Sequence, residues 1–342
     1  MRSIGFLVLA VAGLAAPGLI PLAAASELNV YSARHYPSDD TLYDGFTKAT
    51  GIKLNRVEAS GDQLLARLRQ EGRNSRADVL VVVDAGNLWL AEREGLFRPV
   101  RSAALEKAIP ARLRHPDGLW FGFATRARVV VYNKDAVSAK DAPRRYEDLA
   151  AARWKGKLCM RSSASVYNLS LMASLIHHLG EAEAEAWARG LVANFARAPK
   201  GGDTDQIRAV ATGECAVALA NTYYAARLLK SDQDADRAVA AKIGVVFPNQ
   251  GDRGTHINVS GAGVLAHAPN PANAVRFLEY LLGPEAQALF TAANNEYPVA
   301  IGVAVDPALA RLGNFKADDL AVHVFGENQA RAQKAYDRAG FK

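Results

Sequence analysis

ADVLVVVDAG, residues 77–86, is the stretch of sequence that decides the fold class. Its apolar run from Ala77 to Val83 is almost unbroken, which is typical of a strand that is buried on both faces. A strand of this kind lies inside a sheet that helices cover on both sides. A polar turn that begins at Asp84 follows, and the sequence then predicts a helix over 88–94.

The segments before this strand alternate between strand and helix. The expected elements are a strand at 28–31, a helix at 42–50, a strand at 53–58 and a helix at 61–70. This β-α-β-α-β order predicts a mainly parallel sheet with helices on both faces. Such sheets bind ligands at the carboxyl ends of their strands, so the loops after Tyr31 and Val83 are candidate walls of a site.

The same alternation restarts after about residue 130, and no linker separates the two halves. Further strands are expected at 129–132, 158–160, 216–220, 243–247 and 259–266, with helices at 169–179, 181–192, 205–211, 271–282 and 284–292. A chain of 342 residues is also longer than one hydrophobic core usually serves. We therefore predict an α/β protein with two lobes joined by hinge strands, which cross near 125–132 and 256–264. The first lobe is expected to hold 26–126 and 258–305, and the second lobe 127–257 and 306–342.

Residues 1–25 have the layout of a cleaved secretory signal peptide. Arg2 precedes an apolar run over 4–14, and Ala23-Ala-Ala25 offers a cleavage pattern. The uncharged stretch is long enough to span a bilayer, so a transmembrane anchor is the alternative. Two prolines and the small residues near its end favour the cleaved segment. We expect an exported mature chain without a membrane span.

Composition bounds the partners and the compartment. The chain has 41 basic and 35 acidic residues, a net charge of +6, and the two kinds are interspersed. No long Lys/Arg run is present, so we expect no nucleic-acid partner. The even pair of cysteines, Cys159 and Cys215, predicts a disulfide bond in an oxidising compartment. Two free buried thiols are the alternative.

The sequence lacks the signatures of common enzymes. It has no GxGxxG, P-loop, GxSxG or HExxH motif. His177 and His178 are neighbours in a predicted helix and so point about 100° apart, which keeps them from sharing a metal ion. We expect the protein not to be an enzyme. A Ser/His/Asp triad assembled from separate loops stays open as an alternative at this point.

Four tyrosines fall where predicted strands meet predicted helices. Tyr36 follows the first strand, Tyr167 lies in the polar loop after the strand at 158–160, and Tyr223 and Tyr224 follow the strand at 216–220. An α/β sheet places its ligands at these junctions. A single tyrosine there is explained by aromatic packing with its hydroxyl in water. The position that all four share makes them candidate binding residues.

A series of short stretches carries a family resemblance. They are Tyr31-Ser-Ala-Arg-His-Tyr36, Ala77-Asp-Val-Leu-Val-Val-Val-Asp-Ala-Gly86, Trp154-Lys-Gly-Lys157, Arg161-Ser-Ser163, Gly201-Gly-Asp203, Gly213-Glu-Cys215, Asn221-Thr-Tyr-Tyr224, Phe247-Pro-Asn-Gln250, Gly254-Thr-His-Ile-Asn-Val-Ser-Gly261 and Asn295-Glu-Tyr-Pro298. In this order, from about residue 28 to 300, the chain resembles the periplasmic ferric-iron-binding proteins of ABC transporters, the FutA/FbpA group. The resemblance implies a type II periplasmic-binding-protein fold and a monomeric binding component. It also implies delivery of Fe³⁺ to an inner-membrane permease and its ATPase.

The resemblance also implies which residues bind iron. In this family a tyrosine pair matching Tyr223 and Tyr224 binds the ion, and the tyrosine-rich branch adds tyrosines that match Tyr36 and Tyr167 here. His35 matches a residue that is either a direct ligand or the partner of one. Another branch uses a glutamate, near the position of Glu58, together with a bound anion. The presence of Tyr36 and Tyr167 favours the arrangement without an anion.

Phenolate oxygens suit Fe³⁺ because this ion is a hard, highly charged acid that prefers anionic oxygen. A phenol has a pKa near 10, so ionising one at pH 7 costs roughly 4 kcal/mol, which only a strong Lewis acid offsets. Four phenolates around Fe³⁺ leave a charge of −1, which a nearby cation can balance. Arg34 and Arg227 are our candidates behind the ligands. Arg128 and Arg161 lie in the relevant segments as well.

A small anion, such as a phosphate ester, is the alternative ligand. Loop amides and arginines would hold it. An enzyme on the same two-lobe fold is a further alternative, because a fold does not fix a function.

Overall fold

A computed structural model describes residues 26–34, 36 and 38–342 of the chain. The predicted signal peptide at 1–25 and the candidate His35 lie outside the described residues. In the part of the chain that is described, no helix is both long and apolar enough to cross a membrane.

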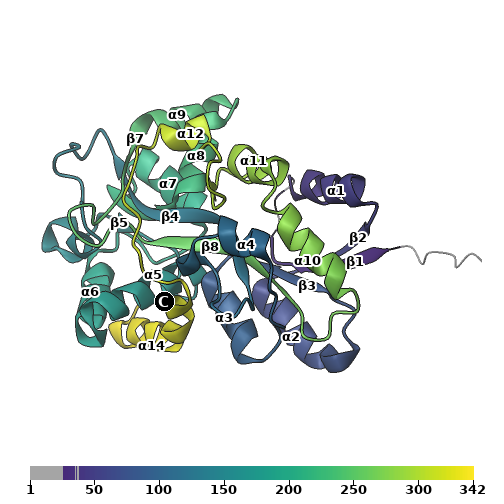
Figure 1. The fold of residues 1–342 in the computed structure, drawn as a ribbon. Helices are drawn as coiled ribbons and strands as arrows, with labels where there is room; N and C mark the ends of the chain where they lie inside the picture. The colour runs from purple at the N-terminus through teal and green to yellow at the C-terminus, as the bar shows by residue number, and fades with distance from the viewer. Residues whose placement is uncertain (1–25, 35, 37) are drawn as a thin grey trace, which may run out of the picture.

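The strands form one mixed sheet that has two halves (Figure 1). The described strands are β1 (Glu27–Ser32), β2 (Lys53–Glu58), β3 (Val79–Val82), β4 (Phe121–Asn133), β5 (Leu158–Cys159), β6 (Val217–Asn221), β7 (Ile243–Val246), β8 (Ile257–Val264) and β9 (Tyr297–Pro298). The first half-sheet consists of β2, β1, β3, β8, β9 and the N-terminal part of β4. The second half-sheet consists of the C-terminal part of β4 with β5, β6 and β7.

The long strand β4 joins the two half-sheets. It pairs with β8 as far as Ala127 and with β6 from Arg128 onward. All 13 of its residues are buried. This passage of one strand through both halves confirms the predicted α/β fold with hinge strands. The exact lobe boundaries stay a prediction.

Helices cover both faces of the sheet (Figure 1). They are α1 (Asp39–Thr50), α2 (Gly61–Glu71), α3 (Ala85–Arg93), α4 (Ala103–Ala108), α5 (Val166–Leu179), α6 (Glu181–Asn194), α7 (Asp203–Thr212), α8 (Thr222–Lys230), α9 (Asp234–Lys242), α10 (Pro271–Tyr280), α11 (Pro284–Ala292), α12 (Pro307–Ala310), α13 (His323–Glu327) and α14 (Gln329–Ala339). In Figure 1, α1, α10 and α11 lie above the first half-sheet and α2 and α3 lie below it. Layers on both sides explain why every residue of β3 is buried.

Local chemistry explains where several helices begin and end. The side chain of Ser60 accepts a hydrogen bond from the backbone of Gln63, whose side chain bonds back to Ser60, so a capping box starts α2. Asp84 caps α3 by accepting from the backbone N–H of Gly86. Gly51 ends α1 in the left-handed conformation that glycine adopts most easily.

The sheet departs from the mainly parallel arrangement predicted for the first half. The alternation at the start of the chain predicted three parallel strands, and β1 indeed runs parallel to both β2 and β3. However, β8 runs antiparallel to both β3 and β4, so the sheet as a whole is mixed. The reason is topological, because β8 enters from the second half and returns in the opposite direction.

Three short helices and the starts of several others were not predicted correctly. Sequence patterns did not predict α4, α9 or α12, and α1 and α3 each begin three residues before the predicted start. Tyr167 was predicted to lie in a loop with the next helix beginning at Leu169, whereas α5 begins at Val166. Tyr167 therefore lies in the first turn of a helix. Its orientation is fixed by α5, not by a loop.

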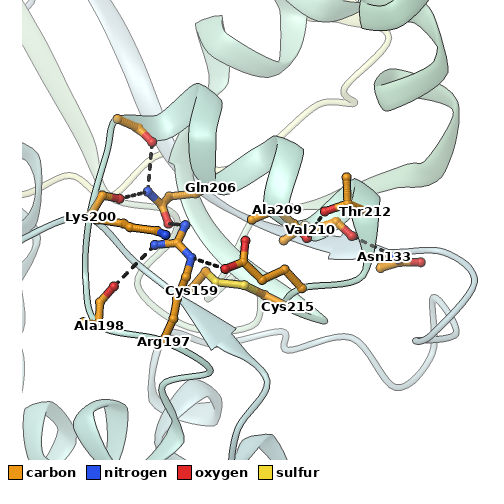
Figure 2. Close-up of a disulfide and its surroundings, with 12 residues drawn as sticks. Asn133, Cys159, Arg197, Ala198, Lys200, Gln206, Ala209, Val210, Thr212 and Cys215 are labelled. Atoms are coloured by element: carbon orange, nitrogen blue, oxygen red, sulfur yellow. Dashed lines mark hydrogen bonds and ion pairs between the residues drawn. A yellow bond between two sulfur atoms is a disulfide. The ribbon is translucent and has the colours of Figure 1, made fainter.

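Cys159 and Cys215 form a disulfide bond, as predicted (Figure 2). The bond links the end of β5 to the segment between α7 and β6, and both cysteines are buried. Beside it, Arg197 forms an ion pair with Glu214 at 2.9 Å. The disulfide thus ties β5, which is followed by the helix of Tyr167, to the start of β6, whose carboxyl end leads to Tyr223.

Candidate metal centre

Three of the four candidate tyrosines come from helices that follow strands of the second half-sheet. Tyr167 lies in the first turn of α5, directly after β5, and Tyr223 and Tyr224 lie in the first turn of α8, directly after β6. Tyr36 comes from the segment between β1 and α1 of the first half-sheet. Each junction is at the carboxyl end of its strand, which is where α/β sheets bind ligands.

The structure brings these four tyrosines together. The hydroxyl of Tyr223 donates a hydrogen bond of 3.1 Å to the hydroxyl of Tyr167. The ring of Tyr36 meets that of Tyr223 edge-on, with 6.4 Å between centroids, and the ring of Tyr224 lies 4.3 Å from that of Tyr223. Tyr223 is therefore the centre of the group, in contact with each of the other three.

Burial makes these phenols hard to ionise in the absence of a cation. Burial is the main cause, and the charge of Glu296 the second, of a rise in the pKa of Tyr36 to about 12. Burial and the neighbouring phenols also raise the pKa of Tyr167 and of Tyr223 above the ordinary value. At neutral pH the three hydroxyls are thus protonated, and a ligand that takes them as phenolates must displace the protons.

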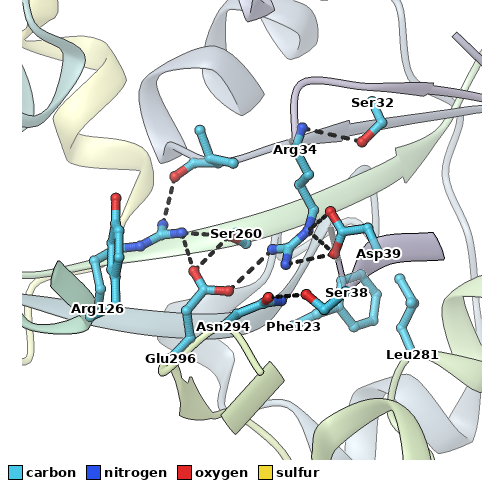
Figure 3. Close-up of polar contacts among 12 residues, drawn as sticks. Ser32, Arg34, Ser38, Asp39, Phe123, Arg126, Ser260, Leu281, Asn294 and Glu296 are labelled. Carbon is cyan, nitrogen blue, oxygen red and sulfur yellow. Dashed lines mark hydrogen bonds and ion pairs between the residues drawn. The ribbon is translucent and has the colours of Figure 1, made fainter. Parts of the chain in front are cut away.

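A buried cluster of charged side chains, shown in Figure 3, adjoins Tyr36 through Arg34, whose guanidinium carbon lies 4.8 Å from the centre of the Tyr36 ring. Glu296 accepts hydrogen bonds from Arg126 at 2.5 Å and from Arg34 at 3.2 Å. Arg34 also bonds to Asp39, and Arg126 donates to the carbonyl of Val83 at 2.6 Å. Each of these charged side chains is almost completely excluded from solvent. Charges at such a depth are tolerated because they are paired.

The two arginines control the ionisation of their neighbours. Burial acts to raise the pKa of Glu296, but the charges of Arg126 and Arg34 hold it below its usual value. Arg126 also acts to lower the pKa of the phenols of Tyr36, Tyr167 and Tyr223. Its guanidinium therefore favours the phenolate form of three of the four tyrosines.

Sequence reasoning missed Arg126 and Glu296. Glu296 lies in the stretch Asn295-Glu-Tyr-Pro298, and Arg126 lies where the hinge crossing was predicted. Both positions were therefore singled out, but as a family motif and as a hinge. Their contact joins residues 170 positions apart, which no local pattern of charge reveals.

The arginines named from the sequence occupy different environments. Arg34 is buried, with its guanidinium carbon 4.8 Å from the centre of the Tyr36 ring. Arg227 is exposed and lies 5.7 Å from the centre of the Tyr224 ring. Glu58 is exposed and pairs with Arg56 at 3.2 Å.

On the second half-sheet, Arg128 and Arg161 both lie against the ring of Tyr167. Their guanidinium carbons are 5.9 Å and 4.9 Å from its centre. Arg128 donates to Asp203 at 2.6 Å and to Asn168 at 2.9 Å, while Arg161 is 3.4 Å from the same aspartate. These bonds fix the first turn of α5, and with it the position of the Tyr167 phenol.

Within the described residues, no group of three or more His, Cys, Asp or Glu side chains is placed to hold a metal ion. The donor atoms that do gather are phenol oxygens, in a buried setting that contains several guanidinium groups. Hard, trivalent cations prefer anionic oxygen donors, whereas softer metals favour sulfur or imidazole. The chemistry of the group thus fits a hard cation of high charge.

Comparison with known proteins places the chain in a family. Residues 74–317 match the model of the bacterial extracellular solute-binding proteins. Iron uptake protein A1 of Synechocystis is 50% identical over 316 residues, which cover 92% of this chain and 88% of that protein.

Solved structures agree with this assignment. The FutA (IdiA) protein of Trichodesmium, solved in complex with iron and citrate ligands, has a TM-score of 0.89 and 52% identity, covering 93% of this chain and all of that one. The ferric binding protein of Campylobacter jejuni has a TM-score of 0.88 and 42% identity, covering 92% of this chain and all of that one. The chain belongs to the bacterial extracellular solute-binding proteins, and within them to the FutA/FbpA group.

Proposed function

We propose that this protein is the soluble, periplasmic binding component of a ferric iron ABC uptake system. It holds Fe³⁺ in the cleft between its lobes through the phenolates of Tyr36, Tyr167, Tyr223 and Tyr224. It then passes the ion to an inner-membrane permease and its ATPase. The observation that carries this proposal is the convergence of four tyrosines from three strand ends in front of buried arginines.

The ionisation of the phenols gives the site its selectivity. A phenol of ordinary pKa costs about 4 kcal/mol to ionise at pH 7, and burial increases that cost for Tyr36, Tyr167 and Tyr223. A trivalent cation offsets it far better than a divalent one, because metal charge depresses the pKa of a ligand. Four phenolates and Fe³⁺ carry a net charge of −1, which the guanidinium of Arg126 faces. His35 is retained as a candidate fifth ligand or as the partner of a ligand.

The lobes divide the ligands unequally. With lobes of 26–126 plus 258–305 and of 127–257 plus 306–342, Tyr36 belongs to the first lobe and the other three tyrosines to the second. The passage of β4 from β8 to β6 between Ala127 and Arg128 supports this division. Closure of the lobes about β4 and β8 would then complete the site around the ion.

The proposal assigns a transport role without catalysis and a monomeric protein. Its relatives support the first part, since the Synechocystis protein is an iron uptake protein and the Campylobacter protein is a ferric binding protein. The arginines near Tyr36 and Tyr167 also leave a small anion, such as a phosphate ester, as the competing ligand.

The test compares iron and phosphate binding in matched variants. Mature protein with Tyr223→Phe and Tyr224→Phe is titrated with Fe³⁺ from a chelator and, separately, with inorganic phosphate. Tyr280→Phe, in α10, controls for the loss of a hydroxyl away from the site. We expect the double variant to lose tight iron binding and the control to keep it. Phosphate binding that survives the double change, with no iron binding by the unaltered protein, would overturn the proposal in favour of the anion.

The metal content of protein purified from its native compartment provides an independent check. Iron at about one ion per chain is expected, because the proposed ligands form a single group around Tyr223 in the part of the chain that the structure describes. Protein that carries no iron after growth in iron-replete medium would contradict the assignment.

A further inference from the structure

The turn between β3 and α3 is bonded to both halves of the molecule through Asp84. Its carboxylate accepts from the N–H of Gly86 at 2.7 Å and from the side-chain amide of Asn258 in β8 at 2.8 Å. It also accepts from the hydroxyl of Ser170, at 3.0 Å from each carboxylate oxygen. Asp84 is 1% exposed and Ser170 is 3% exposed. The bond to Ser170 is notable because that residue comes from α5, on the second half-sheet.

Ser170 lies on the helix that carries Tyr167, three residues further along. Residues at this spacing lie on the same face of a helix. The helix is held to the second half-sheet by Asn168, which accepts from Arg128 at 2.9 Å and whose backbone carbonyl accepts from Tyr336 at 3.0 Å. The Asp84–Ser170 bond therefore connects the first half-sheet to the element that positions one predicted iron ligand.

A second contact joins the same two parts a little further along α3. Gly326 in α13 lies so close to Trp89 that a Cβ atom on the glycine would overlap the Cβ of the tryptophan. Gly326 has an ordinary helical backbone, so closeness and not conformation requires glycine there. α13 also packs on α5 and leads into α14, whose Arg338 pairs with Glu181 of α6 at 2.7 Å. α13 is thus anchored to the second half-sheet.

We propose that the Asp84–Ser170 bond and the Trp89–Gly326 contact form a closing surface between the lobes, which positions Tyr167 opposite Tyr36 when iron is bound. This inference rests on the proposed function. The four residues are positioning residues, since none of them belongs to the tyrosine group. Because the predicted ligands are divided between the lobes, iron binds fully only in the closed form. Any change that weakens closure therefore lowers the apparent affinity for iron in proportion to the fall in the closed fraction of the protein.

The burial of Asp84 is consistent with such a surface. Burial raises the pKa of Asp84 to about 6, and the bonds from Gly86, Ser170 and Asn258, with the charge of Arg126, act in the opposite direction. A carboxylate is removed from water at this point only at a cost that its hydrogen bonds offset. Loss of the Ser170 hydroxyl leaves that carboxylate less well satisfied in the closed form.

The experiment uses the full mature protein and three single variants. Gly326→Ala places a methyl group into Trp89, Ser170→Ala removes one hydrogen bond, and Gly251→Ala is the control, because Gly251 has open space around it and an ordinary backbone. Iron affinity is measured by competition with a chelator, and the radius of gyration by X-ray scattering with and without iron. Visible absorption of the loaded protein reports whether the ligands themselves have changed.

We expect Gly326→Ala to weaken iron binding by more than tenfold and Ser170→Ala by about tenfold, the size typical of one hydrogen bond to a charged group. The absorption of the loaded variants should match that of the unaltered protein, and the loaded Gly326→Ala protein should be more extended. Trp89→Ala combined with Gly326→Ala removes the overlap and should restore most of the affinity. A defect in folding alone would not be reversed in this way.

The outcomes separate the two proposals. If the unaltered protein binds no iron, the proposed function fails. If it binds iron and both Gly326→Ala and Ser170→Ala bind as tightly as Gly251→Ala, the closing surface is wrong. An altered absorption spectrum in either variant, or failure of Trp89→Ala to restore binding to Gly326→Ala, also overturns the positioning role.

Discussion

The two walls of the candidate metal centre are built differently. The wall on the first half-sheet offers one phenol, Tyr36, backed by the buried charges of Arg34, Arg126 and Glu296. The wall on the second half-sheet offers three phenols that are in contact with one another or with a common neighbour. In the proposed site the second wall thus supplies most of the oxygen donors, with Arg128 and Arg161 against the ring of Tyr167. The first wall supplies the remaining donor together with the buried cluster of Arg34, Arg126 and Glu296.

Loss of a single phenol from either wall should have the largest effect on iron binding. Tyr223→Phe removes the phenol that contacts the other three, whereas Tyr36→Phe leaves three phenols on one rigid wall. We expect both to weaken iron binding by more than the 10- to 100-fold typical of residues behind a metal ligand, and Tyr223→Phe to cost more. Competition with a chelator of known affinity measures both. Equal, small losses would contradict a site built on phenolates.

The pH dependence of iron affinity shows how many phenols ionise when iron binds. The hydroxyls of Tyr36, Tyr167 and Tyr223 are protonated in the free protein, since burial raises the pKa of Tyr36 to about 12 and raises those of Tyr167 and Tyr223 above the ordinary value. Each phenolate formed releases one proton, so affinity falls about tenfold per proton for every unit that the pH drops. A pH-stat titration should show more than one proton released per Fe³⁺. The same affinity at pH 5 and pH 8 would be inconsistent with this account.

Replacement of Glu296 tests the buried charge cluster of the first wall while leaving the phenol of Tyr36 in place. Glu296→Gln leaves the buried Arg34 and Arg126 without a shared counter-ion, and we expect a loss of about 3–5 kcal/mol in the free energy of unfolding. The charge of Glu296 acts to raise the pKa of Tyr36, so iron affinity per folded molecule should not fall. Urea denaturation and a chelator competition measure the two quantities. A variant of unchanged stability would mean that the cluster is not held by this carboxylate.

Removal of the disulfide should affect the tyrosine walls least. Cys159→Ser with Cys215→Ser opens a link across 56 residues, and we expect a loss of about 2–4 kcal/mol in stability. The affinity for iron at 25 °C should change little, because Cys215 precedes β6, at the end opposite Tyr223, and neither cysteine belongs to α5 or α8, the helices that carry Tyr167 and Tyr223. Thermal denaturation and iron titration provide the two readings. A large loss of affinity would show that the second wall is not rigid by itself.

Sequence patterns predicted the fold and the tyrosine group because both follow from local order. The apolar run at 77–83 became a fully buried β3, and the junction rule brought Tyr36, Tyr167 and Tyr223 together. The start of α5 was placed too late because its polar first turn resembles a loop. In the folded chain the polar side chain of Asn168 finds Arg128, and no single-sequence pattern shows that partner.

The charged cluster and the contact of Gly326 with Trp89 depend on distant pairs. Arg126 in β4 meets Glu296, the residue before β9, where these two strands pair, and α13 reaches α3 from the far end of the chain. Charged residues are more often exposed than buried. The amino-acid sequence alone therefore gives no reason to predict that a particular arginine or glutamate is buried beside a binding site. These features require the three-dimensional arrangement.

Absorption spectroscopy during a ferric titration shows directly whether tyrosinates bind the iron. Fe³⁺ bound by tyrosinates absorbs visible light through charge transfer from phenolate to metal. We predict a visible band that grows until one equivalent of iron has been added and is strongly reduced in Tyr223→Phe. Protein that binds one equivalent of Fe³⁺ tightly and stays colourless would contradict the account.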